Sequence, residues 1–213
     1  MKTICHRINL YNQNNIYLIE DSIKNGDNSF EVDIQLCNDG LVVFHDDTLE
    51  KIGIHKHVKN FTINELEKYN IYSINRLFVI LDKIESNINV FLDLKGSNEK
   101  LIGALYKILL EFSNRKVMLY IQSFNHFFID LLKDLLVKKR NIVYGYLING
   151  FMNIQWNTYL KKIDFVCIDN TFVNKYVGKI DKNIYIYNCN NPDDIIVDKK
   201  YIKGVITDFP RKF

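Results

Sequence analysis

The chain has little of the chemistry that marks a secreted or zinc-binding protein. Its 213 residues include four cysteines, Cys5, Cys37, Cys167 and Cys189. They are widely spaced and form no CxxC pair, so a zinc site is unsupported. Each lies in or beside an apolar run, where a free, buried thiol is the ordinary expectation and a disulfide is the alternative.

Long apolar runs are also missing. No stretch approaches the roughly 18 apolar residues that a membrane-spanning helix requires. Residues 1–6 lack the apolar segment of a signal peptide. We therefore expect a soluble protein that is cytoplasmic or otherwise intracellular, with no stable insertion in a membrane.

Neither sign of charge dominates the sequence. The chain has 28 Lys and Arg residues against 25 Asp and Glu residues, which gives a net charge of +3. The lysines are scattered among acids rather than gathered in a block, and this argues against nucleic acid as a partner. No linker, repeat or low-complexity tract divides the chain, so residues 1–213 are expected to form a single domain. The sequence leaves the oligomeric state open.

Short apolar runs typical of β-strands alternate with helical patterns along the chain. A run at 41–45 follows the turn signal Asn38-Asp39-Gly40 and predicts a strand hairpinned to its predecessor. Strong amphipathic spacing predicts helices at 98–112 and 125–138, and weaker patterns cover 15–25, 62–69, 75–86, 150–161, 170–180 and 191–199. The eight principal strands are expected at 3–7, 29–36, 89–94, 117–121, 142–146, 163–168, 183–188 and 203–206.

Eight strands separated by helices predict an α/β fold, a compact (β/α)₈ TIM-type barrel with a short hairpin extension after the second strand. An open, doubly wound sheet is the rival architecture. No GxGxxG or GxxxxGK[ST] loop supports that rival. A barrel of this kind places its active residues at the carboxyl ends of its strands.

Three carboxylates follow this rule. Glu31 and Asp33 are two residues apart on the second strand, so both side chains point to one face. Asp93 closes the apolar run of the third strand, with Lys95 on the same face. By itself, the Glu31 and Asp33 pair favours a solvent-facing strand edge, and the Asp93 and Lys95 pair is equally consistent with an ordinary salt bridge at a strand end. Together they predict an oxygen site that suits one Mg²⁺ or Ca²⁺ ion.

Two histidines and an arginine complete the candidate set. His6 ends the first strand and His45 ends the extra strand. Histidine titrates near neutral pH, so one can act as a base and the other as an acid. Arg7 offers a planar fork that matches phosphate oxygens, although a salt bridge at the rim is the structural alternative. His55, His57 and His126 are expected to be structural or exposed.

These motifs resemble those of the glycerophosphodiester phosphodiesterases over essentially the whole chain. The segment 31–46 is the specific part, with Glu31-Val32-Asp33 followed by Asp39-Gly40 and His45-Asp46. The weaker similarities, in chain order, are His6-Arg7-Ile8, Glu20-Asp21-Ser22, Asp93-Leu94-Lys95, Gln122-Ser123-Phe124, Tyr187-Asn188-Cys189-Asn190 and Gly204-Val205-Ile206-Thr207-Asp208-Phe209-Pro210.

The resemblance implies a TIM-type barrel that uses one divalent cation to hydrolyse glycerophosphodiesters to glycerol 3-phosphate and an alcohol. It also implies a role for each candidate, and it places Glu20 near the site without a ligand role. The implied assignments are an acid–base pair of His6 and His45, metal ligands Glu31, Asp33 and Asp93, and phosphate-binding Arg7 and Lys95.

The sequence departs from the family pattern at three positions. Ile8 replaces a glycine and is expected to crowd its loop. Asp93 replaces a glutamate, so this expected ligand is one methylene shorter. The resulting Asp-x-Lys pattern is similar to that of the sphingomyelinase D–like toxins. Tyr187 replaces a tryptophan in the pocket wall. Two alternatives therefore remain: a lysophospholipase D or sphingomyelinase D–like phosphodiesterase, or a non-catalytic barrel that binds phosphoesters.

Overall fold

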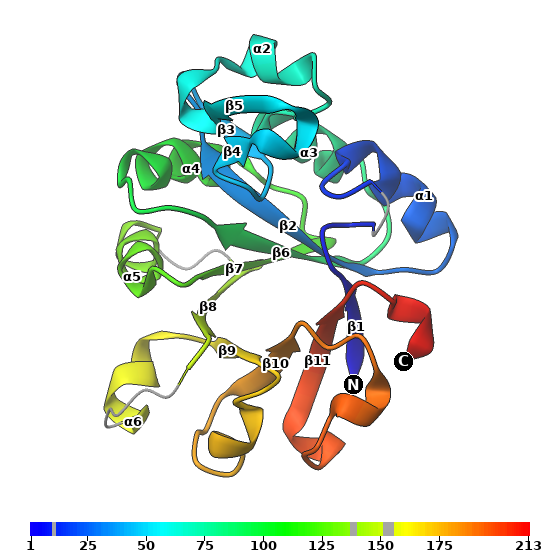
Figure 1. The fold of residues 1–213 in the computed structure, drawn as a ribbon. Helices are drawn as coiled ribbons and strands as arrows, with labels where there is room; N and C mark the ends of the chain where they lie inside the picture. The colour runs from blue at the N-terminus through cyan, green and yellow to red at the C-terminus, as the bar shows by residue number, and fades with distance from the viewer. Residues whose placement is uncertain (10–11, 137–139, 151–155) are drawn as a thin grey trace.

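Eight parallel strands form a closed barrel in the computed structural model, which describes residues 1–9, 12–136, 140–150 and 156–213 (Figure 1). The strands lie in chain order around the sheet, and β1 pairs with both β11 and β2, so the sheet closes. The barrel strands are β1 (Lys2–Cys5), β2 (Ser29–Leu36), β6 (Ile88–Leu94), β7 (Val117–Ser123), β8 (Ile142–Ile148), β9 (Phe165–Asp169), β10 (Asn183–Tyr187) and β11 (Ile202–Thr207). The predicted TIM-type barrel is confirmed.

The strongest helical patterns also became helices, which cover the outside of the barrel (Figure 1). The α-helices are α1 (Ile19–Lys24), α2 (Ile63–Glu67), α3 (Ile74–Asp82), α4 (Lys100–Glu111), α5 (His126–Leu135) and α6 (Trp156–Tyr159). The predicted helices at 125–138 and 150–161 extend partly outside the described residues. No helix in the described part of the chain is long and apolar enough to cross a membrane.

Two of the weaker helix predictions are wrong. The segment 170–180 contains only a 3₁₀ turn at Val173–Lys175. The segment 191–199 contains only a 3₁₀ turn at Pro192–Asp194 and the first residue of another at Lys199–Tyr201. In the first segment, a single turn already buries Val173 and Tyr176 against the barrel. Gly178 then adopts a φ of 76°, a left-handed conformation that stops a helix.

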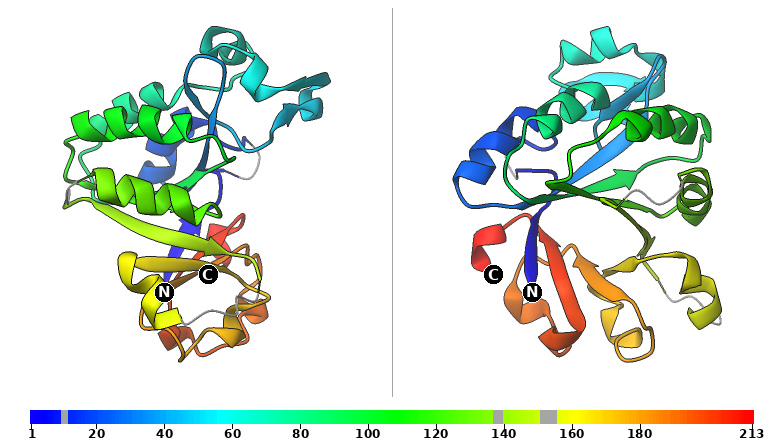
Figure 2. Two further views of the ribbon diagram at one scale, coloured as in Figure 1. Left: turned by 90° about the vertical axis from the view of Figure 1, so that its left-hand side faces the viewer. Right: turned by 180° about the vertical axis from the view of Figure 1, so that it is seen from behind.

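The chain between β2 and β6 builds a small extension above one edge of the barrel. As predicted, β3 (Leu41–Val43) pairs with β2 in an antiparallel hairpin. The sequence did not predict the second hairpin, β4 (Thr48–Leu49) with β5 (Ile54–His57), which projects from the barrel with α2 (Figure 2). This extension has its own apolar core, made of Cys37, Val42, Leu49, Val58, Leu66 and Ile71.

The interior of the barrel is filled with aromatic rings. Phe91 stacks on Tyr120 with ring centroids 4.2 Å apart, and Phe165 and Tyr185 pack edge-on against this pair. Gly145 makes room for the Phe165 ring, because a Cβ at that position would lie 2.4 Å from it. Since Phe91 precedes Asp93 by two residues on β6, the aromatic layer forms a floor beneath the polar end of the strand. All four cysteines are free and buried, as expected.

Candidate active site

One small pocket at the carboxyl end of the barrel brings together all seven residues that the sequence singled out. Its volume is about 170 Å³. The polar and aromatic side chains of Gln122, Phe124, Tyr187 and Asn188 also line it. The seven predicted residues on its wall are His6, Arg7, Glu31, Asp33, His45, Asp93 and Lys95. Glu20, by contrast, is exposed on α1 and does not line the pocket.

The three predicted metal ligands are buried close together. Asp33 and Asp93 are partners in the β2–β6 register, and Glu31 lies on the same face of β2. One oxygen from each carboxylate falls in a group whose members lie within 4.8 Å of one another. The Oδ1 of Asp93 is buried and has no hydrogen-bond partner in the described structure. Buried, all-oxygen donors with an unpartnered oxygen fit a hard divalent cation.

The pKa values of the three acids are shifted in different directions. Burial, together with the charges of Asp33 and Asp93, raises the pKa of Glu31 well above its usual range. Burial likewise raises the pKa of Asp93, to about 6. For Asp33, burial is outweighed by Lys95 and by a hydrogen bond from Asn14, so its pKa is lowered. Repulsion between clustered carboxylates is the strain that a bound cation would relieve.

The two positively charged side chains of the pocket both contact Asp33. Lys95 Nζ lies 3.0 Å from Asp33 Oδ1 and 2.5 Å from Asp93 Oδ2. Burial lowers the pKa of Lys95, but these two carboxylates outweigh that effect and raise it overall. Arg7 Nε lies 3.2 Å from Asp33 Oδ2, and the Arg7 backbone N–H donates to Glu31 Oε2. Both positive side chains are therefore held at the mouth of the acidic cluster.

The loop after β1 has an unusual backbone. Arg7, Ile8 and Asn14 all have positive φ values, of 51°, 68° and 59°. For a β-branched residue such as Ile8 this conformation is a genuine outlier. The expected crowding does not reach the pocket, because the Ile8 side chain packs into the apolar core instead. Its burial offsets the cost of the strained backbone.

Asn14 is a site residue that the sequence reasoning missed. It is buried, its Nδ2 donates to Asp33 Oδ2 at 2.9 Å, and its Oδ1 accepts the Asp33 backbone N–H. These bonds fix the orientation of the Asp33 carboxylate. No spacing or motif in the sequence signals this contact, because it depends on how the loop after β1 folds back over β2.

His6 is held by a residue from the far end of the chain. Its Nδ1 lies 2.6 Å from Asp208 Oδ1, and Asp208 Oδ2 accepts a bond from Asn190 Nδ2. Since a carboxylate accepts, Nδ1 carries the proton, and Nε2 is left to face Glu31 at 3.9 Å. Burial lowers the pKa of His6 in spite of Asp208. The neutral imidazole with a free Nε2 suits a general base.

His45 reaches the pocket because β3 runs back along β2. The Phe44 backbone N–H donates to the Asp33 carbonyl, so the next residue lies at the level of the acidic cluster. His45 Nδ1 lies 2.7 Å from Asp46 Oδ1, and Asp46 Oδ2 lies 2.7 Å from Lys51 Nζ. Gln35 Nε2 donates to the carbonyls of Phe44 and Asp46 and fixes this turn.

Not every histidine belongs to the site. His126 is half-buried at the start of α5, where its ring nitrogens bond to Tyr159 Oη and the Leu147 carbonyl. This is the structural role expected from the sequence. His55 and His57 are exposed on β5, also as expected.

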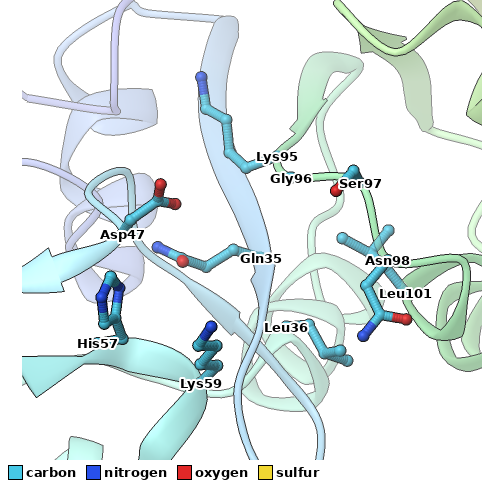
Figure 3. A pocket seen from close by; sticks show the side chains of 10 residues that line it. All are labelled: Gln35, Leu36, Asp47, His57, Lys59, Lys95, Gly96, Ser97, Asn98 and Leu101. Atoms are coloured by element: carbon cyan, nitrogen blue, oxygen red, sulfur yellow. The ribbon is translucent and has the colours of Figure 1, made fainter.

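A second cavity adjoins the catalytic pocket. Its volume is about 330 Å³, and Lys95 lines both. Figure 3 shows it between the β4–β5 extension, which contributes His57 and Lys59, and the turn after β6, which contributes Ser97 and Asn98. We call this cavity the outer groove.

Comparison with known proteins identifies a family for this chain. A model of the glycerophosphoryl diester phosphodiesterase family matches residues 9–212. The chain belongs to the glycerophosphoryl diester phosphodiesterase family. It is therefore a phosphoric diester hydrolase, as the sequence predicted. His6 and Arg7 precede the matched range, so their assignment depends on the pocket geometry. No curated protein matches the chain.

Solved structures share the fold of this family member. A phosphodiesterase from Oleispira antarctica, in complex with the product sn-glycerol-3-phosphate, is 20% identical with a TM-score of 0.82, covering 100% of this chain and 94% of that one. A glycerophosphodiester phosphodiesterase from Thermotoga maritima is 19% identical with a TM-score of 0.72, covering 98% and 94%. A calcium-dependent phosphoinositol-specific phospholipase C from Pseudomonas is 10% identical with a TM-score of 0.62, covering 99% and 90%.

Proposed function

We propose that this chain cleaves glycerophosphodiesters to glycerol 3-phosphate and an alcohol with His6 and His45 as its acid–base pair. One observation carries the proposal. Two histidines, each with its Nδ1 bonded to a carboxylate, line the same pocket as the buried cluster of three acids. The product bound in the Oleispira antarctica structure, sn-glycerol-3-phosphate, supports this substrate class.

The roles of the two histidines follow from their surroundings. His6 is the base, because burial keeps it neutral and its Nε2 is free to accept a proton. It takes that proton from the nucleophile, which is either water or a neighbouring hydroxyl of the substrate. As the new P–O bond forms, the bond to the alcohol breaks, and His45 gives its proton to the departing oxygen. With water as the nucleophile, this step gives glycerol 3-phosphate directly. With the substrate hydroxyl, it gives a cyclic phosphate, and water then opens that ring to glycerol 3-phosphate while the two histidines exchange their acid and base roles.

The charged residues hold the phosphate. Arg7 and Lys95 face the phosphate oxygens and stabilise the negative charge of the transition state. Glu31, Asp33 and Asp93 would hold one Mg²⁺ or Ca²⁺ ion, and such an ion supplies Lewis-acid stabilisation of a phosphoryl oxygen. The calcium dependence named for the Pseudomonas enzyme is consistent with a hard cation in this kind of barrel.

The decisive assay follows glycerol 3-phosphate release from glycerophosphocholine and glycerophosphoethanolamine, with Mg²⁺, with Ca²⁺ or with EDTA. We expect release that needs a metal and falls roughly 10²–10⁴-fold in His6→Ala and in His45→Ala, the usual effect of removing an acid–base group. Near-wild-type rates in both variants would contradict the histidine assignment. A folded protein that releases no product with either metal would contradict the substrate class, and lysophospholipid or sphingomyelin cleavage would be measured next.

A further inference from the structure

The outer groove offers more space than the catalytic pocket that it adjoins. The pocket, at about 170 Å³, is about half the size of the groove, at about 330 Å³. Lys95 and Gly96 line the groove and also a shallow depression that includes His45. A diester whose phosphate contacts Lys95 in the pocket therefore has room for one of its two alcohols on the groove side of His45, the proposed proton donor to the leaving group.

The groove has Leu36 and Leu101 on its wall, but most of the residues that line it are polar, and they carry both signs of charge. Lys59 and His57 point into it from the β4–β5 extension, and neither makes an ion pair in the described structure (Figure 3). Asp47 is the one carboxylate among its described lining residues. No Phe, Tyr or Trp ring lines the described groove, so it lacks the aromatic cage typical of sites for quaternary ammonium groups such as choline.

We propose that the outer groove binds the leaving alcohol and favours an amino alcohol that carries a carboxylate. This rests on the proposed function. Lys59, with His57 beside it, faces the carboxylate, and Asp47 faces the ammonium group. Ser97 and Asn98 provide the hydrogen-bonding wall opposite them. Charge complementarity of this kind gives specificity through the difference in affinity between similar ligands.

The test uses two substrates that differ by one carboxylate, glycerophosphoserine and glycerophosphoethanolamine. We expect wild type to have the higher kcat/KM for glycerophosphoserine. Lys59→Ala should reduce the ratio of the two kcat/KM values on the order of threefold to tenfold, in keeping with a partly exposed charge pair. Asp47→Asn should slow both substrates and leave their ratio unchanged. Lys56→Ala is the matched control, because Lys56 is exposed in the same extension but does not line the groove.

Each outcome separates this proposal from the proposed function. Hydrolysis of both substrates with the same ratio in wild type, Lys59→Ala and Lys56→Ala would overturn the groove assignment and leave the function intact. An equal loss for both substrates in Lys59→Ala would also overturn it. Failure of wild type to cleave either substrate with Mg²⁺ or Ca²⁺ would remove the proposed function and the groove assignment with it.

A second, independent observation concerns Gln122 on β7. Register pairs Asp33 with Asp93 and Asp93 with Gln122, so the three side chains form one row across β2, β6 and β7. Gln122 is 1% exposed and lines the catalytic pocket. Its Oε1 is buried without a hydrogen-bond partner in the described structure, as is Asp93 Oδ1 beside it. Buried carbonyl oxygens are rarely left unpaired without a reason.

We infer that Gln122 Oε1 is a fourth protein ligand of the cation held by Glu31, Asp33 and Asp93. Amide carbonyl oxygens are ordinary ligands of Mg²⁺ and Ca²⁺. A cation would satisfy both unpaired oxygens at once. With Gln122, the ligands would come from β7 as well as from β2 and β6, which carry the three acids.

Calorimetric titration with Mg²⁺ and Ca²⁺ tests this role without any substrate. Gln122→Met keeps the volume of the side chain and removes its oxygen, and we expect it to weaken the Kd roughly tenfold to hundredfold. Gln122→Glu should bind at least as tightly as wild type. Asn188→Ala, an exposed position on the wall of the same pocket, is the control and should leave the Kd unchanged. An unchanged Kd in Gln122→Met for both ions would overturn the assignment.

Discussion

The Nδ1 of His6 lies 2.6 Å from the Oδ1 of Asp208, a contact between residues 202 positions apart. The β1–β11 register produces it, because Cys5 is paired with Thr207 and the two next residues leave adjacent strand ends. Asn190 holds Asp208 in place by donating to its carboxylate and accepting its backbone N–H. The pair thus fixes both the orientation and the tautomer of the proposed base.

Replacing this carboxylate should slow the reaction without loosening substrate binding. In Asp208→Asn the side chain keeps its size but loses the charge that stabilises a protonated His6. We expect kcat to fall roughly tenfold to hundredfold with little change in KM, the range seen when the partner of a functional imidazole is removed. Asp198→Asn, at an exposed acid that caps a surface turn, is the control. A KM effect alone would contradict the positioning role.

Metal binding should be visible as a gain in stability. A ligand that binds only the folded state at a hundred times its Kd stabilises by about 2.7 kcal/mol. For a chain of this size, that corresponds to a Tm increase of roughly 5–11 °C. We expect this increase with Mg²⁺ or Ca²⁺ in a thermal melt, its reversal by EDTA, and its loss in Glu31→Gln. A Tm that neither ion changes would contradict the predicted cation site.

Two glycines offer a matched test of barrel packing. A Cβ at Gly145 would lie 2.4 Å from the buried Phe165 ring, so Gly145→Ala should destabilise the fold by about 1–3 kcal/mol through overpacking. Gly103 lies on the exposed face of α4, where an added methyl group would meet no atom within 4 Å. Gly103→Ala should therefore stabilise by about 0.8–1 kcal/mol, because alanine is the better helix former. Urea unfolding measures both changes in unfolding free energy. Equal effects of the two substitutions would contradict the close packing of Gly145 against Phe165.

His126 should make stability depend on pH. Burial lowers its pKa, although the Leu147 carbonyl and Asp130 partly oppose this. As pH falls below about 6.5, His126 takes up a proton in the unfolded state before it does so in the folded state. Its contribution to the free energy of unfolding is therefore complete above that pH and is lost on acidification. We expect the loss of unfolding free energy between about pH 8 and about pH 5 to be smaller in His126→Gln than in wild type. A larger loss in the variant would contradict the sign.

The positions of the strands could be predicted because each strand is a local pattern. Every barrel strand is a short apolar run, and its period and flanking turn residues are visible in the sequence. The segments at 170–180 and 191–199 show the limit of that reasoning. Their apolar spacing resembles a helix, but a single turn is enough to bury Val173, so helical propensity does not decide their conformation.

Candidate residues with a motif or a strand-end position could be found in the same way. Glu31, Asp33 and Asp93 follow from strand periodicity together with the rule that barrels carry their chemistry at one end. Asn14 gave no comparable signal, and Gln122 and Asp208 appeared only within the weaker family similarities, with no role assigned to either. Asn14 acts through a loop with left-handed backbone angles, and the other two act through neighbours in the sheet that are distant along the chain.

By itself, the sequence determined the barrel, its family and the seven residues of the pocket, because these depend on local patterns and on short motifs. Only the tertiary structure decided which carboxylate holds His6, where the β4–β5 extension lies and how the outer groove meets Lys95. These features depend on strand register and on packing between distant segments. Closure of the sheet between β1 and β11 brings the two ends of the chain together, and no local pattern in either segment encodes that contact.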